Sequence, residues 1–546
     1  MTVGSWFLMG DNGERLKAAL GAIVDELRAS GSVSRNQLNK IKVKHAKQFG
    51  LNQIPTNAAI LAMMPEENRD TFLPVLKRRS KRTMSGVSII AAMTKPLPCP
   101  GRCLYCPGRE SQPDEPVAQS YTGREPAALR SLMYGYDPFK QVSARINDLE
   151  SIGHVCDKIE LIIMGGTFLS TSKEYQEYFV KGCIDGVLEN ESARLSEAKK
   201  LAETSHRRII GITFETRPDF CMAPHVDAML DYGGTRVEIG VQTTYDDVYN
   251  LVGRGHDAAT TKKAIQVARD AGFKVCFHMM PNMPGSSVNR DKAMFEELFS
   301  NDAYRPDYLK IYPCLVVNGT TLEKWWREGR YEPYSIDELI DLLAHMKSRL
   351  PSWTRIQRVQ RDIPADLILE GIKNSNLREL IWEAMDKKGL RCNCIRCKEY
   401  GFSRQHQVDE SIPDIDELLI KKEKYAASGG SECFISALHP ETENIFGYVR
   451  LRKPSSSYHR PEMQGVPSSI IRELRVVGEV VPVDKVAKKL QAQHRGLGKH
   501  LLHLAEEVAR SDFSSEKLLV ISGIGVRQYF YNLGFAPDGP YVSKRI

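Results

Sequence analysis

Short β-branched runs alternate with stretches of helical period between Gly86 and Tyr312, and this alternation constrains the fold more than any other feature. The runs are Val87–Met93, Ile159–Met164, Ile209–Phe214, Arg236–Gly240, Lys274–Met279 and Tyr308–Tyr312. The helical stretches include Pro126–Ile152, Ala258–Ala271 and Lys292–Phe299. Strands that alternate with helices build parallel sheets, because each helix returns the chain to the same end of the sheet. The sequence therefore predicts an α/β domain with a parallel sheet, open or closed as a barrel.

Five of the six predicted strands are followed by a loop of unusual composition. The loops are Cys99–Cys106, Gly165–Thr167, Glu215–Asp219, Val241–Thr243 and Met280–Gly285. In barrels built from βα units the active site forms at the C-terminal ends of the strands. We therefore expect these loops to meet in one cavity, although they are far apart in the sequence.

The first of these loops holds three cysteines in a C-x3-C-x2-C spacing: Cys99, Cys103 and Cys106. Clustered cysteines in a chain without a secretion signal indicate metal binding rather than disulfides. Three thiolates this close can hold three irons of a [4Fe–4S] cluster and leave the fourth iron free for a small molecule. A zinc knuckle that lacks one ligand is the competing interpretation. The position of the loop after a strand favours the iron–sulfur cluster.

This spacing resembles the signature of the radical S-adenosylmethionine (SAM) superfamily. The resemblance implies a partial (βα) barrel, a [4Fe–4S] cluster on Cys99, Cys103 and Cys106, and SAM bound to the free iron. One-electron reduction by the cluster then cleaves SAM to a 5′-deoxyadenosyl radical, and the protein supplies position and exclusion of water. The cofactor-binding residues expected at the strand ends are Gly165, Gly166, Thr167 and Gln242.

A second nucleotide site is indicated near the C-terminus. The loop of Gln493, His494, Arg495, Gly496, Leu497 and Gly498 precedes a predicted helix over Lys499–Ala509. Such a loop places backbone N–H groups and the positive end of the helix dipole at a pyrophosphate. The backbone of the preceding predicted strand, Ile471–Val480, could pair with the amide arm of coenzyme A through Glu473, Leu474, Arg475 and Val476.

The order of these elements, followed by the aromatic run Tyr529–Phe535, resembles the GNAT acetyltransferase fold. The resemblance implies acetyl-CoA as a ligand, with Tyr529 near the thioester sulfur. A plain α+β domain with a glycine turn is the alternative.

The N-terminal region reads as helical and basic. No acid occurs between Arg35 and Met64, whereas Arg35, Lys40, Lys42, Lys44 and Lys47 are basic. A second stretch without acids runs from Thr71 to Arg109, although the net charge of the whole chain is only +7. A surface of one sign attracts phosphate backbones. A solvated basic face without a partner is the alternative.

A radical SAM domain followed by a GNAT domain resembles the catalytic acetyltransferase subunit of the Elongator complex and its single-chain archaeal and bacterial relatives. The strings that carry the resemblance are Met93–Pro96, Met164–Phe168, Glu215–Asp219, Arg358–Pro364 and Gly539–Lys544. The resemblance runs from about Lys81 to the C-terminus and implies a radical SAM domain over 81–385, a zinc-binding connector over 386–415 and a GNAT domain over 416–546. Before it, the basic helical region over 1–80 is expected to bind tRNA.

The connector holds a second cysteine cluster, Cys392, Cys394 and Cys397, which resembles the zinc motif of this family. A closed tetrahedral Zn²⁺ site needs a fourth ligand. His406, Cys314 or another distant cysteine remain alternatives for it. The remaining cysteines are expected to be buried apolar residues.

The family acts on uridine 34 in the anticodon stem-loop of tRNA. In the chemistry proposed for it, the acetyl group of acetyl-CoA loses a methyl hydrogen to the deoxyadenosyl radical, adds to C5 of the uracil and leaves a carboxymethyl group after thioester hydrolysis. The resemblance assigns catalytic roles to Tyr529 and to Lys158, which resembles a lysine that reaches acetyl-CoA from the radical domain. We therefore expect the Gln493–Gly498 pocket to face the cavity that contains Cys99, Cys103 and Cys106, with Lys158 near the passage.

Other functions compete with this interpretation. They are a protein lysine acetyltransferase with a structural iron–sulfur domain, a radical methylthiotransferase and a non-catalytic RNA-binding scaffold. Elongator-type accessory subunits or self-association are further partners that the resemblance suggests. The sequence has no apolar run of about 18 residues and no secretion signal. A cytoplasmic location without membrane contact is expected.

Overall fold

The computed structural model describes residues 11–76, 86–107, 117–400, 413–477 and 496–546. The chain divides into two compact units. The first comprises Met1–Ser88 with Ser143–Asp157, and the second comprises Ile89–Val142 with Lys158–Ile546. Within the described residues, no helix is both long and apolar enough to cross a membrane.

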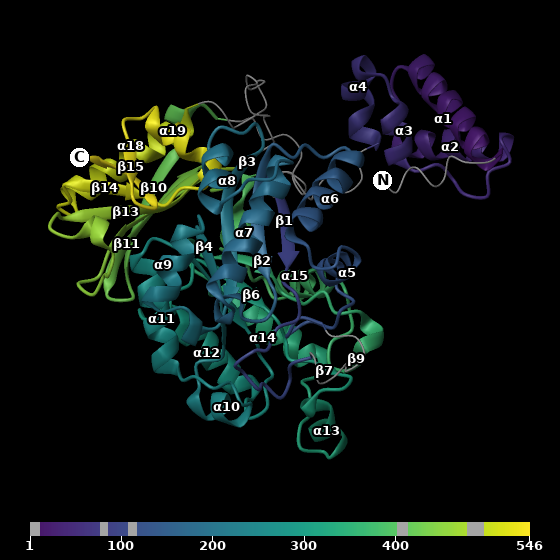
Figure 1. The fold of residues 1–546 in the computed structure, drawn as a ribbon. Helices are drawn as coiled ribbons and strands as arrows, with labels where there is room; N and C mark the ends of the chain where they lie inside the picture. Colours follow the sequence, from purple (N-terminus) through teal and green to yellow (C-terminus); the bar gives the residue numbers. More distant parts are fainter. Residues whose placement is uncertain (1–10, 77–85, 108–116, 401–412, 478–495) are drawn as a thin grey trace. The chain divides into compact units, whose positions relative to one another are not determined.

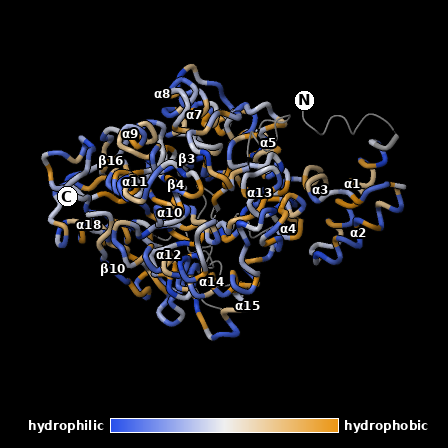
Figure 2. The backbone as a smooth tube through the Cα atoms, turned by 90° about the horizontal axis from the view of Figure 1, so that it is seen from below, coloured by the Kyte–Doolittle hydropathy of each residue, from blue (hydrophilic) through white to orange (hydrophobic). Residues whose placement is uncertain are grey.

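The first unit is helical, as predicted. It contains α1 (Asp11–Ser30), α2 (Arg35–Gln48), α3 (Asn57–Met63) and α4 (Glu66–Leu76). Ser34 caps α2, because its side chain accepts from the N–H of Gln37 while the Gln37 side chain accepts from the N–H of Ser34. Hydrophobic and hydrophilic residues alternate along α1 and α2 (Figure 2). The apolar faces meet in a core that includes Leu27, Leu38 and Phe72.

The second unit is built around a parallel sheet. Its strands lie in the order β1-β2-β3-β4-β5-β6-β8. Their bounds are Ser88–Met93, Lys158–Met164, Arg208–Thr216, Arg236–Gln242, Lys274–Met279, Tyr308–Ile311 and Arg355–Arg358. Because β1 and β8 lie at opposite edges of the described sheet, it is an open partial barrel (Figure 1). This confirms the radical SAM type of α/β fold that the sequence predicts.

Helices connect the strands of this sheet. They are α5 (Pro126–Met133), α6 (Pro138–Ser151), α7 (Lys173–Leu188), α8 (Leu195–Ala202), α9 (Ala223–Asp231), α10 (Asp246–Leu251), α11 (Ala258–Asp270), α12 (Val288–Ser300), α13 (Thr321–Arg327), α14 (Ile336–Ser348) and α15 (Leu377–Lys387). A small pair of strands, β7 (Val316–Val317) and β9 (Ile368–Glu370), packs beside them.

Two predictions about this region need correction. The predicted helix Pro126–Ile152 is two helices, because Gly135 and Tyr136 adopt positive φ angles and Pro138 cannot continue a helical hydrogen-bond pattern. The strand β8 was not predicted. Its sequence, Arg-Ile-Gln-Arg, carries no continuous β-branched run, and pairing with β6 stabilises it.

The C-terminal part of this unit is a second sheet, in the order β10-β11-β12-β13-β14-β16-β15. The strands are Leu419–Ala427, Gly430–Leu438, Ile445–Lys453, Ser468–Val476, Lys517–Val520, Tyr541–Arg545 and Ala536–Asp538. Neighbouring strands in this sheet are antiparallel, except for the parallel pair β13 and β14. The antiparallel pattern, which was predicted from about Glu432, therefore has one exception. It also begins earlier than predicted, at β10. Helix α18 (Leu497–Ser511) packs on this sheet, and α19 (Arg527–Tyr531) follows β14.

The second sheet contacts the parallel sheet where the strands of the parallel sheet begin, at their N-terminal ends. The hydroxyl of Tyr541 donates to the carbonyl of Ala271 before β5 at 3.0 Å, and Nη1 of Arg208, the first residue of β3, donates to the carbonyl of Gly525 at 3.4 Å. Nη2 of Arg450 donates to the carbonyl of Trp353, just before β8, at 2.7 Å. In Figure 1 the C-terminal strands accordingly lie on the side away from α10, which follows the C-terminal end of β4.

Candidate functional site

The loop Cys99–Cys106 lies at the C-terminal edge of the parallel sheet, as predicted. The backbone of this loop forms hydrogen bonds with two other segments. The N–H of Leu104 donates to the carbonyl of Val252 at 3.1 Å, and the carbonyl of Leu104 accepts from the N–H of Leu322 at 2.9 Å. Gly101 has no room for a side chain, because a Cβ atom there would overlap Nη1 of Arg217. The loop therefore has one defined course across the strand ends.

Each cysteine sulfur of this loop contacts a polar group from a different segment. Oγ1 of Thr167, after β2, lies 3.4 Å from Sγ of Cys99. Nη1 of Arg254 lies 3.5 Å from Sγ of Cys103, and Nε2 of Gln119 lies 3.3 Å from Sγ of Cys106. Hydrogen-bond donors around sulfur are typical of thiolates that bind metal clusters.

The three sulfurs are spaced apart. Among the described residues, they do not form a group whose ligand atoms all lie within 4.8 Å of one another, whereas other cysteines of the chain do. Thiolates that each bind a different iron of one cluster need this wider separation, and thiolates that share one ion do not. The half-buried cysteines Cys99, Cys103 and Cys106 therefore fit an iron–sulfur cluster better than a single zinc ion.

The glycine loop after β2 adopts a backbone that other residues disfavour. Gly165 and Gly166 have φ angles of 124° and 64°. A Cβ atom on Gly165 would overlap Oγ1 of Thr94, and one on Gly166 would lie 3.3 Å from Cβ of Gln119. The glycine loop therefore packs closely on Thr94 and Gln119, and its next residue, Thr167, lies beside Cys99.

Buried polar atoms without a hydrogen-bond partner gather at the same edge. In the described part of the chain they include the hydroxyl of Tyr105, Nη1 of Arg217, Oε1 of Gln242, Oγ1 of Thr244 and Nε of Arg254. Gln242 also has a φ angle of 70°, which costs energy in a residue with a side chain. Native proteins leave few such atoms unpaired. The group therefore indicates a place for a polar ligand.

The interior face of the parallel sheet carries a chain of charged residues that sequence reasoning missed. Glu238 on β4 lies 2.8 Å from Nε2 of His278 and contacts the ammonium group of Lys310. Lys310 also lies 3.6 Å from Glu215, which accepts from the hydroxyl of Tyr121 at 2.8 Å. The sequence did contain a signal for this charged face, because Arg236 and Glu238 are two residues apart on a predicted strand and therefore point to the same side of the sheet.

This charged interior disfavours a metal ion. Ligand atoms of Glu238, Cys276 and His278 lie within 4.8 Å of one another. Burial alone would lower the pKa of Lys310, but Glu238, Tyr312 and Glu215 raise it, so Lys310 keeps its positive charge. An ammonium group already neutralises Glu238, and a cation would be repelled.

The predicted acetyl-CoA residues meet at the start of α18. Gly496 has a φ angle of 96°, and the helix begins at Leu497. A Cβ atom on Gly498 would lie 3.1 Å from the hydroxyl of Tyr529, so the glycine loop and the tyrosine are neighbours. Gln493 and Arg495 lie outside the described residues.

Among the described residues, one edge of β13 is paired over only part of its length. β14 pairs only with residues 468–471, whereas Glu473–Val476 pair with β12 on the other edge. In the described residues no strand pairs with the free edge of Glu473–Val476. An unpaired strand edge next to a helix N-terminus can receive an extended amide chain.

The expected position of the acetyl-CoA pocket, which was predicted to face the cavity of the cluster cysteines, needs correction. The second sheet contacts the N-terminal ends of the parallel strands, whereas Cys99, Cys103 and Cys106 lie at the C-terminal ends. Lys158 is the first residue of β2 and pairs in register with Arg208, whose side chain contacts Gly525. Lys158 therefore lies at the end that faces the second sheet. The interior of the partial barrel separates the two predicted sites.

The predicted basic residues of the first unit differ in exposure. Lys40 and Lys47 on α2 are exposed. Lys44 is exposed but lies 2.8 Å from Glu26, and Lys42 is only 9% exposed and donates to Oδ1 of Asn57. Lys42 is therefore a packing residue rather than a free surface charge. The predicted basic residues within 77–85, and Arg109, lie outside the described residues.

The second cysteine cluster is compact. The sulfurs of Cys392, Cys394 and Cys397 lie within 4.8 Å of one another. The pKa of Cys394 is lowered well below its usual value, because Cys392 and Cys397 donate hydrogen bonds to it. Cys314 lies instead in the apolar cluster with Leu104, so it does not complete this group, and His406 is outside the described residues. The other isolated cysteines are buried, as expected.

Three models of known families match parts of this chain. Residues 16–84 match the ELP3 N-terminal domain. Residues 98–298 match the radical SAM superfamily, and residues 306–387 match the radical SAM C-terminal domain.

Three relatives are similar over most of the chain. The chain is 41% identical to the tRNA uridine(34) acetyltransferase of Methanocaldococcus jannaschii over 540 residues, which cover 98% of this chain and 99% of the relative. It is 40% identical to human Elongator complex protein 3 over 540 residues, 98% of each chain. The solved structure of the archaeal Methanocaldococcus infernus Elp3 with an N-terminal deletion matches with a TM-score of 0.75 at 41% identity, over 85% of this chain and all of that one.

Proposed function

This chain belongs to the family of tRNA uridine(34) acetyltransferases and Elongator complex protein 3, and from that premise we propose that it modifies uridine 34 of tRNA with a group derived from acetyl-CoA. The observation that carries the proposal is the meeting of three separated cysteine sulfurs and several unpaired polar atoms at one edge of a parallel sheet. A cluster bound there supplies one-electron cleavage of SAM and so a radical for hydrogen abstraction. The protein itself orients and shields the reactants.

The strand-end residues divide the binding of cluster and SAM between them. Cys99, Cys103 and Cys106 would hold three irons of the cluster. Gly165 and Gly166 bring backbone close to the ligand, and Gln242 offers a buried amide oxygen that lacks a partner. This oxygen can accept from a ligand hydroxyl or amine.

We assign the C-terminal sheet to the GNAT acetyltransferase fold. Three features support the assignment: the parallel pair β13–β14 within an antiparallel sheet, the free edge of β13 beyond Ile471, and the contact between Gly498 and Tyr529. The N-terminus of α18, together with the loop of Gln493 and Arg495, binds the pyrophosphate of acetyl-CoA. The edge at Glu473, Leu474, Arg475 and Val476 pairs with the amide arm.

The acetyl group must then reach the radical through the interior of the partial barrel. A parallel strand of six or seven residues spans about 20 Å. Atoms that exchange hydrogen must approach to about 3–3.5 Å. Acetyl-CoA would therefore approach from the end where Lys158 and Glu473 lie, and the buried side chains of Glu238 and Lys310 in the interior would have to make room for its acetyl end. Lys158 guides this entry.

The remaining parts bind RNA and metal. The exposed lysines of α2, Lys40 and Lys47, contact tRNA phosphates, while base selection occurs in the strand-end cavity, where an unstacked base can enter. Cys392, Cys394 and Cys397 bind Zn²⁺ and fix the connector between the two sheets. Elongator-type subunits or a second copy of the chain are candidate partners.

The test is acetyl-CoA deuterated at its methyl group, incubated with protein, SAM, reductant and tRNA. Deuterium should appear in 5′-deoxyadenosine, and the modified uridine should carry the acetyl carbons. Replacing Cys99, Cys103 and Cys106 by alanine should abolish both products, whereas Cys183→Ala, a buried thiol of α7, should not. Acetyl transfer to protein lysine without SAM cleavage would show that the chain is a protein acetyltransferase instead.

A further inference from the structure

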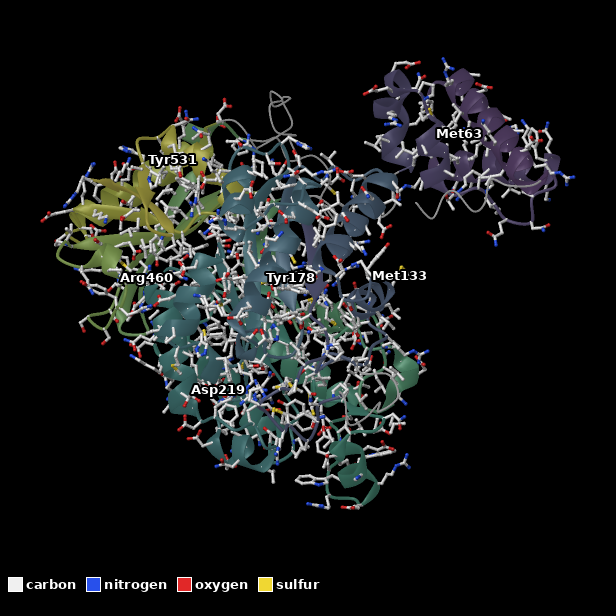
Figure 3. The ribbon with its side chains drawn as sticks, in the orientation of Figure 1. Met63, Met133, Tyr178, Asp219, Arg460 and Tyr531 are labelled. Atoms are coloured by element: carbon white, nitrogen blue, oxygen red, sulfur yellow. The ribbon has the colours of Figure 1, made fainter. Side chains whose placement is uncertain are left out.

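Arg254 is a buried guanidinium beside the cluster cysteines without a carboxylate partner in the described part of the chain. The residue is 7% exposed, and its Nη1 lies 3.5 Å from Sγ of Cys103. Arg217 next to it differs, because it forms an ion pair with Asp219, which is labelled in Figure 3. A buried charge without a counter-charge is costly. An anionic group is therefore required opposite Arg254.

The backbone around Arg254 holds the guanidinium in place. Nη2 donates to the carbonyl of Gly240 at 2.6 Å, and the carbonyl of Arg254 accepts from Nη2 of Arg217 at 2.8 Å. A Cβ atom on Gly240 would lie 2.5 Å from Nη2, so the glycine makes room for this side chain. These contacts point Nη1 at the cysteine loop and leave it little freedom to turn away.

Among the described residues, the other cations near this loop do not take this role at Cys103, and Arg361 acts instead on Cys106. Arg217 is neutralised by Asp219. His256 lies close by, but burial first and then the charges of Arg254 and Arg217 lower its pKa to about 4, so it is neutral at pH 7. The polar side chains within hydrogen-bond distance of Cys99 and Cys106 belong to Thr167, Gln119 and Ser120, which are uncharged, while Arg361 acts on Cys106 through its charge.

We infer that Arg254 is a positioning residue that neutralises the thiolate group of the cysteine loop and thereby sets the reduction potential of the cluster. The inference rests on the proposed function, because it needs the cluster. Reduction adds one negative charge to the cluster. A fixed positive charge beside a ligand sulfur stabilises the reduced state and raises the potential.

The test is a redox titration of reconstituted protein, monitored by electron paramagnetic resonance in the absence of SAM. In Arg254→Gln, which removes the charge, the ratio of reduced to oxidised cluster at a fixed potential should fall about tenfold, a shift of ~59 mV for one electron. Arg254→Lys should shift the potential less. Arg290→Gln removes an arginine that pairs with Asp247 on the surface and should leave the potential unchanged.

The possible results show whether Arg254 faces the cysteine thiolates or another anionic group. An unchanged potential in Arg254→Gln overturns the inference. A change in SAM affinity without a change in the potential also overturns it, because Arg254 would then face the carboxylate of SAM. Loss of iron in both variants shows a purely structural role. A wild-type protein that shows no [4Fe–4S] signal refutes the proposed function rather than this assignment alone.

Discussion

Arg472 donates two parallel hydrogen bonds to Asp307, one from each terminal nitrogen at 2.7 Å, and this pair joins the C-terminal sheet to the parallel sheet. Both side chains are fully buried. Arg472 also donates to Glu432 on β11, which in turn accepts from Arg452. The two sheets are therefore held together by charges that have no access to water, in addition to apolar contacts.

Removing one member of this network should destabilise the second unit strongly. We expect Asp307→Asn to lower the free energy of unfolding by about 3–5 kcal/mol, because it leaves Arg472 buried without a full counter-charge. Urea titration measures this. The control is Asp341→Asn, which breaks an exposed pair with Lys388 and should cost less than about 1 kcal/mol. Equal effects of the two changes would contradict the role of the network.

Glu473 should make stability depend on pH in acid. Burial alone would raise its pKa, but Arg450, Lys274 and Arg475 lower it from 4.5 to about 2. Since the folded pKa is depressed, the stabilisation is complete above pH 4.5 and is lost as the pH falls toward 2. Glu473→Gln should flatten the stability profile in this window. The exposed Glu328→Gln should leave the profile as it is in the wild type.

Gly165 should tolerate no side chain at the SAM site. Gly165→Ala introduces a Cβ atom that overlaps Thr94, in addition to the strain of a positive φ angle. Gly534→Ala is a matched control, because Gly534 also has a positive φ angle but no atoms lie within 4 Å of the added Cβ. Both variants should lose stability, and only Gly165→Ala should lose SAM affinity, measured by equilibrium binding. Normal SAM affinity in Gly165→Ala would place the cofactor elsewhere.

Tyr529 should act on acetyl-CoA without affecting SAM. Its hydroxyl lies beside Gly498, at the end of the molecule away from Cys103. Loss of a hydrogen-bond donor at a reacting carbonyl slows acyl chemistry by about 10²-fold. Tyr529→Phe should therefore reduce release of coenzyme A while cleavage of SAM continues, and Tyr531→Phe should change neither. A parallel loss of SAM cleavage would show that the two ends are not separate sites.

Cys394 should be required for zinc. Purified protein should contain about one zinc ion per chain in addition to iron, and Cys394→Ser should remove it, because the buried sulfur of Cys394 lies within 4.8 Å of those of Cys392 and Cys397. Iron content should be unaffected. Elemental analysis checks both metals, and well-folded protein that contains iron but no zinc would refute the assignment. Cys433→Ser, at a buried thiol outside the cluster, is the control.

The sequence by itself determined the parallel sheet and the place of its main site. Short β-branched runs mark the strands β1 to β6, and the loops of Cys99–Cys106 and Gly165–Thr167 follow strands. Parallel strands end at one edge, so the convergence of these loops could be predicted without coordinates. Local hydrogen-bond rules also determined the helices of the first unit, although Gly135 and Tyr136 interrupt one helical pattern elsewhere.

Only the tertiary structure decided how the two halves meet. The docking of the second sheet at the strand starts depends on contacts such as Arg472 with Asp307, which are 165 residues apart and have no local signature. Burial likewise decided that Lys42 packs and Lys40 stays exposed, and folding placed Arg254 beside Cys103 with no carboxylate partner in the part of the chain that the structure describes. Charge and hydrogen-bonding capacity are properties of a residue, but the partners that satisfy them come from distant segments, which only folding brings together.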